Sequence, residues 1–300
     1  MSPQLHSEGL NLYEQFIEVS KALSEASASF WSDLEIYNRL NRGQTDIVKK
    51  SKCLKRTVTI TTVNGTQEYG LRDNSFSDIT DIVDGGVYFK INGSTYSPLT
   101  FKSKKQLAIE YPGWQGTVAG TPSVYYWNKT TKTIGLYPKP NSSNAGAYLF
   151  VEGYHLPKVL HAGTASSGST STIVLPAGSS TLPYPSTTDD YYNNLYIEIY
   201  SGTGAGQKVK ITDYVASTRI CTATFSTAPD NTSVYGMVPQ IPEDAQGLMI
   251  SYALWKLWPK GGSRVTLGEK YRQEYYAGLS EFIGEFTEDE DEEIVRDSYR

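Results

Sequence analysis

The hydrophobic period of this chain changes twice along its length, and this constrains the fold more than any other feature. Apolar side chains recur every three or four positions over residues 11–29 and 33–52, which predicts amphipathic helices. From about residue 57 the pattern becomes short alternating runs separated by Gly, Pro and Asn, which is typical of strands and turns. The helical period returns at Ile241 and predicts helices up to about residue 286. We therefore expect helices from both chain ends and a long β region between them.

The first two predicted helices begin at residues that can cap free backbone amides. Asn11 with Glu14, and Ser32 with Glu35, match the capping box. A single amphipathic pair would leave an apolar stripe in water, so the helices of both chain ends should meet in a small four-helix bundle.

The second predicted helix also contains residues that disfavour a helix, namely Asn38, Asn41 and Gly43. Something other than helix propensity must keep them there. We expect either packing or a subunit contact.

The β region opens with an expected hairpin. Residues 57–63 alternate, Asn64-Gly65 is a strong hairpin turn, and residues 67–71 lead back. The short strands that follow favour a β-sandwich or barrel. From about His161 the composition shifts to Gly, Ala, Ser and Thr, and the strand-like runs beyond it carry almost no helical signal. Residues 162–236 therefore read as a separate β module.

The expected fold class is α+β: a small bundle of helices from both chain ends beside a β-sandwich or barrel-like domain, plus an inserted all-β module. The expected domains are, in chain order, the N-terminal helices of the bundle (1–56), the β domain (57–161), the inserted β module (162–236), the C-terminal helices of the bundle (237–287) and an acidic C-terminal arm (288–300).

Several classes of protein are disfavoured by simple features. Cys53 and Cys221 lie far apart without a Cys/His cluster, which argues against a disulfide framework and a structural zinc site. Residues 1–10 have neither a basic start nor an apolar core, so we expect no signal peptide. No apolar run approaches the ~20 residues of a membrane span. We expect a chain that is made and kept in the cytosol and has no membrane partner.

Charge is placed unevenly. Residues 281–300 hold nine acids and two arginines, a net charge of −7, whereas the whole chain carries −5 and residues 1–280 therefore carry +2. A nearly neutral body does not indicate a nucleic-acid binder. The acidic arm has two open interpretations: a disordered solubiliser, or a docking arm that orders on binding. Its apolar anchors would be Phe282, Phe286, Ile294, Val295 and Tyr299.

Two basic runs, at residues 49–56 and 102–105, could contact phosphate. We favour a simpler interpretation, in which solvated cations at a helix end complement the helix dipole. Tyr is the commonest aromatic, with 23 copies against 9 Phe and 5 Trp. Subunit interfaces and half-buried strands explain this excess equally well.

The most tempting chemical motif contains Gly202, Gly204 and Gly206, followed by Gln207 and Lys208. A dinucleotide fingerprint needs its third glycine one residue later, and a nucleotide-cradling loop needs Gly-Lys-Ser/Thr. The residues that follow alternate like a strand. We therefore expect a glycine-rich turn between two strands.

No other pattern predicts catalysis. His155 and His161 lack further ligands for a metal, and no serine lies in a Gly-x-Ser-x-Gly elbow. The acid pairs Asp189-Asp190 and Asp78/Asp81 are better explained as turn and cap residues. We expect no enzyme activity, no cofactor and no metal site.

Three stretches together resemble the head-to-tail adaptor (connector or neck) proteins of tailed phages. The first is the helix that begins Trp31-Ser-Asp-Leu-Glu-Ile-Tyr. The second is Gly120-Thr-Pro-Ser-Val-Tyr-Tyr-Trp, followed by Ile134-Gly-Leu-Tyr-Pro-Lys-Pro and Tyr154-His-Leu-Pro. The third is Ile241-Pro-Glu-Asp with the helix around Tyr252-Ala-Leu-Trp. The insert at 162–236 departs from the family pattern and is similar to small β modules of other phage structural proteins.

The resemblance implies a ring of about twelve copies, a dodecamer, beneath the portal of the phage head. Such a ring extends the DNA channel and offers an attachment surface to the tail tube, nozzle or fibre protein. The resemblance places the chain at the head–tail junction of the virion after assembly in the host cytoplasm, with its C-terminal helices and arm toward the portal. The docking role would fall on Phe282, Phe286, Ile294, Val295 and Tyr299. DNA would slide through without specific binding, which the near-neutral body favours.

An alternative function stays open. The chain could be a tail or fibre-attachment protein whose β insert binds a host glycan or a fibre protein. A third possibility, a tail-associated hydrolase, finds no supporting residues.

Overall fold

A computed structural model describes residues 9–24, 30–71, 78–90, 96–116, 118–261 and 265–297. The chain divides into two compact units. One, the helical unit, comprises Met1–Ser51 and Pro157–Arg300, and the other, the sandwich unit, comprises Lys52–Leu156. The fold class is α+β, as the change of period predicts.

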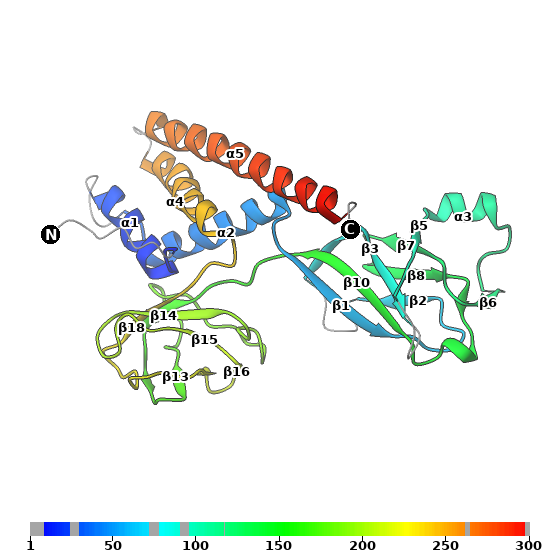
Figure 1. The fold of residues 1–300 in the computed structure, drawn as a ribbon. Coiled ribbons are helices and arrows are strands. Elements are labelled where there is room, and N and C mark those ends of the chain that lie inside the picture. Colours follow the sequence, from blue (N-terminus) through cyan, green and yellow to red (C-terminus); the bar gives the residue numbers. More distant parts are fainter. Residues whose placement is uncertain are drawn as a thin grey trace. The chain divides into compact units, whose positions relative to one another are not determined.

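Helices from both chain ends pack against one another in the helical unit (Figure 1). They are α1 (Leu12–Ser24), α2 (Asp33–Ser51), α4 (Glu243–Leu257) and α5 (Val265–Asp297), with a short 3₁₀ turn, η2 (Trp258–Gly261), between the last two. Leu12, Leu40, Ile47, Met249 and Tyr275 are fully buried between them. The predicted bundle is confirmed, and α5 runs past its expected end at residue 286.

The predicted cap of α1 is present. Asn11 Oδ1 accepts a hydrogen bond from the Glu14 amide at 3.1 Å, and the Asn11 amide donates to Glu14 Oε2 at 3.0 Å. At α2, Ser32 Oγ accepts from the Glu35 amide at 3.2 Å. The predicted first helix extended to residue 29, but residues 25–29 lie outside the described part of the chain.

The sandwich unit is built from two four-stranded sheets. The first sheet has the order β1 (Lys55–Thr61), β10 (Tyr148–His155), β3 (Ile79–Lys90) and β4 (Ser97–Pro98). The second has the order β2 (Glu68–Gly70), β8 (Thr133–Tyr137), β7 (Val124–Asn128) and β5 (Thr100–Phe101). Smaller elements complete it: α3 (Lys104–Glu110), the parallel pair β6 (Ala119–Gly120) and β9 (Lys139–Pro140), and the 3₁₀ turn η1 (Ser142–Asn144).

One apolar core joins the two sheets, as in a β-sandwich. Val58, Phe89 and Leu149 come from the first sheet, while Ile134 and Leu136 come from the second. Alternate residues of β1 therefore face this core, and the threonines between them are exposed. On the second sheet, Tyr126 belongs to a separate buried cluster with Leu107 of α3 and Trp114.

The hairpin predicted over residues 57–71 is wrong. β1 pairs with β10, whereas β2 pairs with β8 in the other sheet. The Asn64-Gly65 turn is therefore a corner that carries the chain from one sheet to the other. The Gly65 amide donates to Pro140 O at 2.8 Å, and Tyr69 Oη accepts from the Val63 amide. These hydrogen bonds hold the backbone of the corner. Alternation identifies which side of a strand is buried, but it does not identify the neighbouring strand.

The inserted residues form two further antiparallel sheets within the helical unit. One has the order β11 (Ala162–Thr164), β18 (Val234–Met237), β14 (Tyr196–Ser201) and β15 (Lys208–Lys210). The other has the order β12 (Ser167–Gly168), β13 (Thr172–Val174), β17 (Ile220–Thr222) and β16 (Asp213–Val215). The residues after the glycine-rich motif, expected to alternate as a strand, form β15 and then β16, which lie in different sheets.

The helices in the described part of the chain include none with the length and apolar character that a membrane span requires.

Candidate interaction surfaces

Two buried amides of α2 hold the ends of the β module. Asn41 Nδ2 donates to Leu160 O at 3.1 Å, and Asn41 Oδ1 accepts from the Leu160 amide at 2.7 Å. Gln44 Nε2 donates to Lys158 O at 3.2 Å, while its Oε1 accepts from the Gln240 amide at 2.8 Å. Lys158 precedes the module and Gln240 follows it. The Gln44 side chain therefore binds both segments that connect the module to the helices.

The start of α1 forms a second attachment. Asn11 Nδ2 donates to Glu198 Oε2 of β14 at 3.1 Å, and the Tyr13 ring lies 5.1 Å from the Tyr200 ring. Gly236 of β18 permits the close approach, because a Cβ there would lie 2.3 Å from Asn11 Oδ1. The module is thus attached to two helices by buried polar groups, which favours a fixed orientation over a flexible tether.

Gly43 lies at a point where two helices pack closely together. A Cβ at this position would lie 3.2 Å from Tyr252 Cδ1 and 3.3 Å from Met249 Cα, so the missing side chain lets α2 and α4 approach closely. Of the residues that disfavour a helix, Asn41 and Gly43 are therefore retained by packing within this chain. Asn38 is exposed.

The glycine-rich stretch is a turn between β14 and β15, as predicted. Gly202, Gly204 and Gly206 all have positive φ, and the amides of Gly206 and Gln207 donate to carbonyls of the turn and its strand. Gln207 closes the turn against the facing loop, because its Nε2 donates to Thr227 O at 3.0 Å and its Oε1 accepts from the Thr227 amide at 2.9 Å. The amides of Ala205, Gly206 and Gln207 are used within the turn and its strand, which disfavours a phosphate cradle.

His161 is a buried structural residue. Its Nε2 lies 3.0 Å from Pro183 O and its Nδ1 lies 2.8 Å from Tyr235 Oη, so the neutral ring donates to the carbonyl and accepts from the hydroxyl. Burial lowers the pKa of His161 to about 4, against a smaller opposing effect of the Pro183 carbonyl. The ring therefore stays neutral at pH 7 and serves packing.

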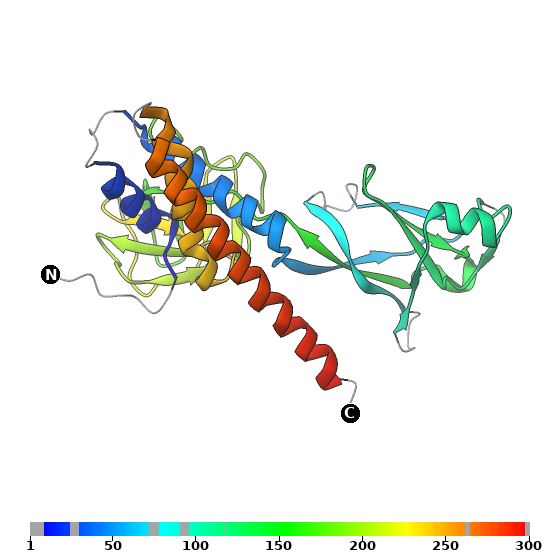
Figure 2. The same ribbon diagram turned by 90° about the horizontal axis from the view of Figure 1, so that it is seen from above.

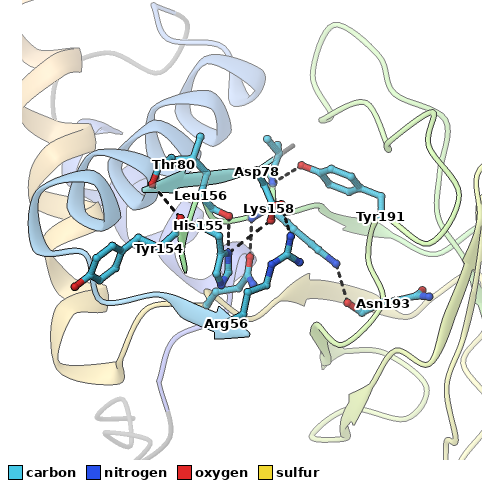
Figure 3. A network of polar contacts seen from close by, with 11 residues as sticks. Arg56, Asp78, Thr80, Tyr154, His155, Leu156, Lys158, Tyr191 and Asn193 are labelled. Atoms are coloured by element: carbon cyan, nitrogen blue, oxygen red, sulfur yellow. Dashed lines mark hydrogen bonds and ion pairs between the residues drawn. The ribbon is translucent and has the colours of Figure 1, made fainter. Parts of the chain in front are cut away.

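Figure 3 shows a polar network of the sandwich unit, formed where β1 and β3 begin and β10 ends. Asp78 forms an ion pair with Arg56 of β1, and the ring of His155 lies 3.8 Å from the second carboxylate oxygen. Asp78 O also accepts from the Leu156 amide at 3.1 Å, which ties the end of β10 to the start of β3. These contacts assign Asp78 a structural role. Asp81 pairs with Lys129 on the surface at 2.8 Å.

In the helical unit, the same view shows Lys158 extended toward Asn193, whose carbonyl accepts from Lys158 Nζ at 2.8 Å. Asp190 Oδ1 accepts from Asn193 Nδ2 at 2.7 Å, and Asp189 Oδ1 accepts from the Ala216 amide at 2.8 Å. Both aspartates hold turns. Among the described residues, no group of three or more His, Cys, Asp or Glu side chains is placed to hold a metal ion.

The predicted docking residues fall mostly beyond the described side chains. Phe282 is on α5 and is buried, with 8% of its surface exposed. Phe286, Ile294 and Val295 lie on the described backbone of α5, and their side chains are outside the described set, as is Tyr299 altogether. The structure therefore places Phe282 in the packing of the bundle and gives no contact for the others.

An aromatic face covers the outer side of the first sandwich sheet. Tyr148 and Phe150 of β10 point away from the core, and their rings lie 6.2 Å apart. Tyr96 lies 5.1 Å from Phe150, and Lys90 Nζ lies 4.3 Å from the Tyr96 ring. Tyr88 is opposite Phe150 in the sheet and is exposed. Sequence reasoning raised subunit interfaces as one use of Tyr but did not locate this face. The local signal that points to it is the presence of apolar residues on both faces of the strand at 147–154.

A second surface combines cations and aromatic rings on α2, α4 and α5, which lie side by side (Figure 2). We call it the basic–aromatic surface, and its residues are Arg39, Arg42, Lys49, Lys50, Tyr252, Trp255, Lys256 and Tyr276. Lys256 Nζ lies 3.3 Å from the Trp255 ring centroid, and Lys50 Nζ lies 4.7 Å from that of Tyr276.

Five of the eight residues of this surface are cations, and Asp46 lies beside them. Burial lowers the pKa of Lys256, and Arg39 and Lys50 lower it further against the attraction of Asp46. Asp46 also pairs with Lys50 at 2.6 Å and accepts from Tyr275 Oη at 2.5 Å. Sequence reasoning favoured a helix end over a phosphate contact for the run 49–56. It missed this surface, because the residues come from three segments that are distant in the sequence.

One family model, described as SU10 adaptor protein, matches residues 13–179 of the chain. The match spans the helices α1 and α2, the whole sandwich unit and the first strands of the β module. No curated protein gives a significant match.

Proposed function

The chain belongs to the SU10 adaptor protein family of phage structural proteins, and from this premise we propose that it forms the ring joining the portal of a phage head to the tail. The proposed ring has about twelve copies, matches the symmetry of the portal and extends the DNA channel. It would lie at the head–tail junction of the virion, after assembly in the host cytoplasm.

The observation that carries this proposal is the family match, which covers more than half of the chain and includes elements of both units. A fixed architecture also suits the role, because Asn41 and Gln44 attach the β module to the helices that would face the portal. The net charge of +2 over residues 1–280 suits a channel wall that DNA passes without tight phosphate contacts. We propose no catalytic activity.

We propose that the arm beyond Phe282 docks on the portal through Phe286, Ile294, Val295 and Tyr299. Phe282 itself is buried and would anchor the base of the arm. Size-exclusion chromatography of the full chain with portal rings of the same phage tests this role. We expect co-elution, and its loss in a variant that stops after Gly284. If the shortened variant co-elutes as well as the full chain, the arm has no docking role.

The alternative is a fibre-attachment protein whose β module binds a host glycan or a fibre protein. A glycan array and a fibre pull-down with the full chain separate the two functions. Binding in either assay together with no portal co-elution would favour the alternative.

A further inference from the structure

The basic–aromatic surface has more cations than its neighbours neutralise. Lys50 pairs with Asp46, and Arg39 lies 3.9 Å from Glu35. Arg42 and Lys49 are exposed seven residues apart on the same face of α2, and neither forms an ion pair among the described residues. Arg42 also contributes to the positive field at Tyr252. An anionic partner would therefore pair with Arg42 and Lys49 without displacing an ion pair of the described residues.

The rings at this surface favour a partner that is not purely anionic. Tyr276 is 43% exposed, and Trp255 lies 5.7 Å from it and is partly exposed beneath Lys256. Aromatic rings combined with arginine are enriched at protein interfaces, where apolar contact and charge pairing act together. The chemistry of the surface therefore matches a segment that interleaves carboxylates with apolar side chains.

Such a segment occurs in this chain. Residues 285–297 contain eight acids against one arginine, and they also contain Phe286, Ile294 and Val295. The charges of the two regions are opposite, and both would be present at equal copy number in any assembly of this protein.

The segment does not reach the surface of its own chain. α5 contributes Tyr276 to the surface and continues as one helix to Asp297. At about 1.5 Å per residue, Glu288 lies about 18 Å farther along the axis, and an unbroken helix does not turn back.

We infer that the basic–aromatic surface binds the acidic segment 285–297 of a second copy of this chain. The contact joins different surfaces of neighbouring copies, so it is heterologous and closes a ring when the rotation fits. This inference rests on the proposed ring and adds the residues that join its subunits. Because a helix exposes side chains on all sides, one side of the segment would contact the neighbouring copy and another side would contact the portal.

Carbodiimide cross-linking tests the contact directly, because this reagent joins a lysine amine to a carboxylate only when the two are in contact. Equal amounts of ¹⁵N-labelled and unlabelled full-length chain are assembled on portal rings, cross-linked and digested. We expect peptides that join Lys49 or Lys50 to residues 288–293 and that contain one labelled and one unlabelled half. Links found only between halves of the same label, or links of this segment to the portal with none to α2, would overturn the inference.

Charge reversal provides the second test. We expect Arg42→Glu with Lys49→Glu to weaken self-association about tenfold or more in sedimentation velocity, and added salt to weaken that of the unaltered chain. Further reversal of Glu290 and Glu293 to Lys should restore association. The control is Lys105→Glu with Lys210→Glu, which makes the same charge change at exposed lysines elsewhere.

The outcomes separate the inference from the proposed function. If the unaltered chain forms no ring with the portal, the proposed function fails. If it forms a ring and the Arg42/Lys49 variant forms the same ring equally well, the function stands and this contact is wrong. If the variant loses DNA binding while assembly is unchanged, the surface serves phosphate and the inference is again wrong.

Discussion

The side-chain amide of Asn41 pairs with both backbone groups of Leu160, donating to its carbonyl at 3.1 Å and accepting from its amide at 2.7 Å. Asn41 is buried within α2, and Leu160 precedes the first strand of the β module. This polar side chain therefore helps to fix the module on the helix bundle, whereas an apolar residue would leave two buried backbone groups without partners.

The first prediction concerns this contact. We expect Asn41→Ala to lower the free energy of unfolding by about 2–4 kcal/mol, because the buried amide and carbonyl of Leu160 lose their partner. Urea unfolding measures the change. Asn38→Ala, at an exposed position of the same helix, is the control and should stay within about 0.5 kcal/mol. Equal effects of the two substitutions would contradict the role of Asn41.

The second prediction concerns Gly236, where a Cβ would lie 2.3 Å from Asn11 Oδ1 and 2.7 Å from the Tyr13 amide nitrogen. We expect Gly236→Ala to cost about 1–3 kcal/mol, because the start of α1 must move away from the module. Gly247→Ala in α4 is the control, since nothing lies within 4 Å of its Cβ. It should raise the melting temperature through helix propensity. A neutral Gly236→Ala would show that α1 does not pack as described.

The third prediction is a pH dependence from His161, whose folded-state pKa of about 4 lies below its usual value of 6.5. The unfolded chain binds the proton more readily, so stability from this residue is complete above pH 6.5 and falls as the pH decreases toward 4. Between pH 7 and pH 4.5 the loss should be about 2–3 kcal/mol. Urea unfolding at both pH values measures it.

The matched variant for this pH effect is His161→Gln, which carries no charge at either pH. We expect it to be less stable at pH 7, and its further loss on acidification should be smaller than that of the unaltered chain by the same 2–3 kcal/mol. The comparison removes the contribution of the carboxylates, which both proteins share. An identical pH dependence of the two would rule out His161 as its source.

The fourth prediction concerns Gln207, whose side chain joins the glycine-rich turn to the loop at Thr227. We expect Gln207→Ala to speed hydrogen exchange of the Thr227 amide about tenfold or more, because this amide loses its acceptor and the turn opens locally. Exposed Thr224 provides the control through Thr224→Ala. Unchanged protection at Thr227 would mean that the turn is closed by other contacts.

The helices were predictable because their signals are local. The capping pair Asn11/Glu14 and the 3.6-residue period lie within a few residues of one another, and both are confirmed. Partners of strands are not local. Residues 57–71 carry a hairpin pattern, yet β1 pairs with β10 and β2 pairs with β8, far away in the sequence.

The surfaces were the least predictable part. Asn41 was recognisable as an unusual helix residue, but nothing near it in the sequence points to Leu160. The basic–aromatic surface brings together Lys50, Lys256 and Tyr276 from three helices, and only the packing of those helices places them side by side. A surface of this kind has no sequence motif of its own.

The ring that we propose for this adaptor would assemble on the portal. Native mass spectrometry of the full chain, alone and mixed with portal rings of the same phage, tests it most directly. We predict a complex whose mass equals the portal plus about twelve copies of the chain, as matched ring symmetry requires. A mixture in which the portal keeps its own mass and the chain stays monomeric would rule out the proposed ring.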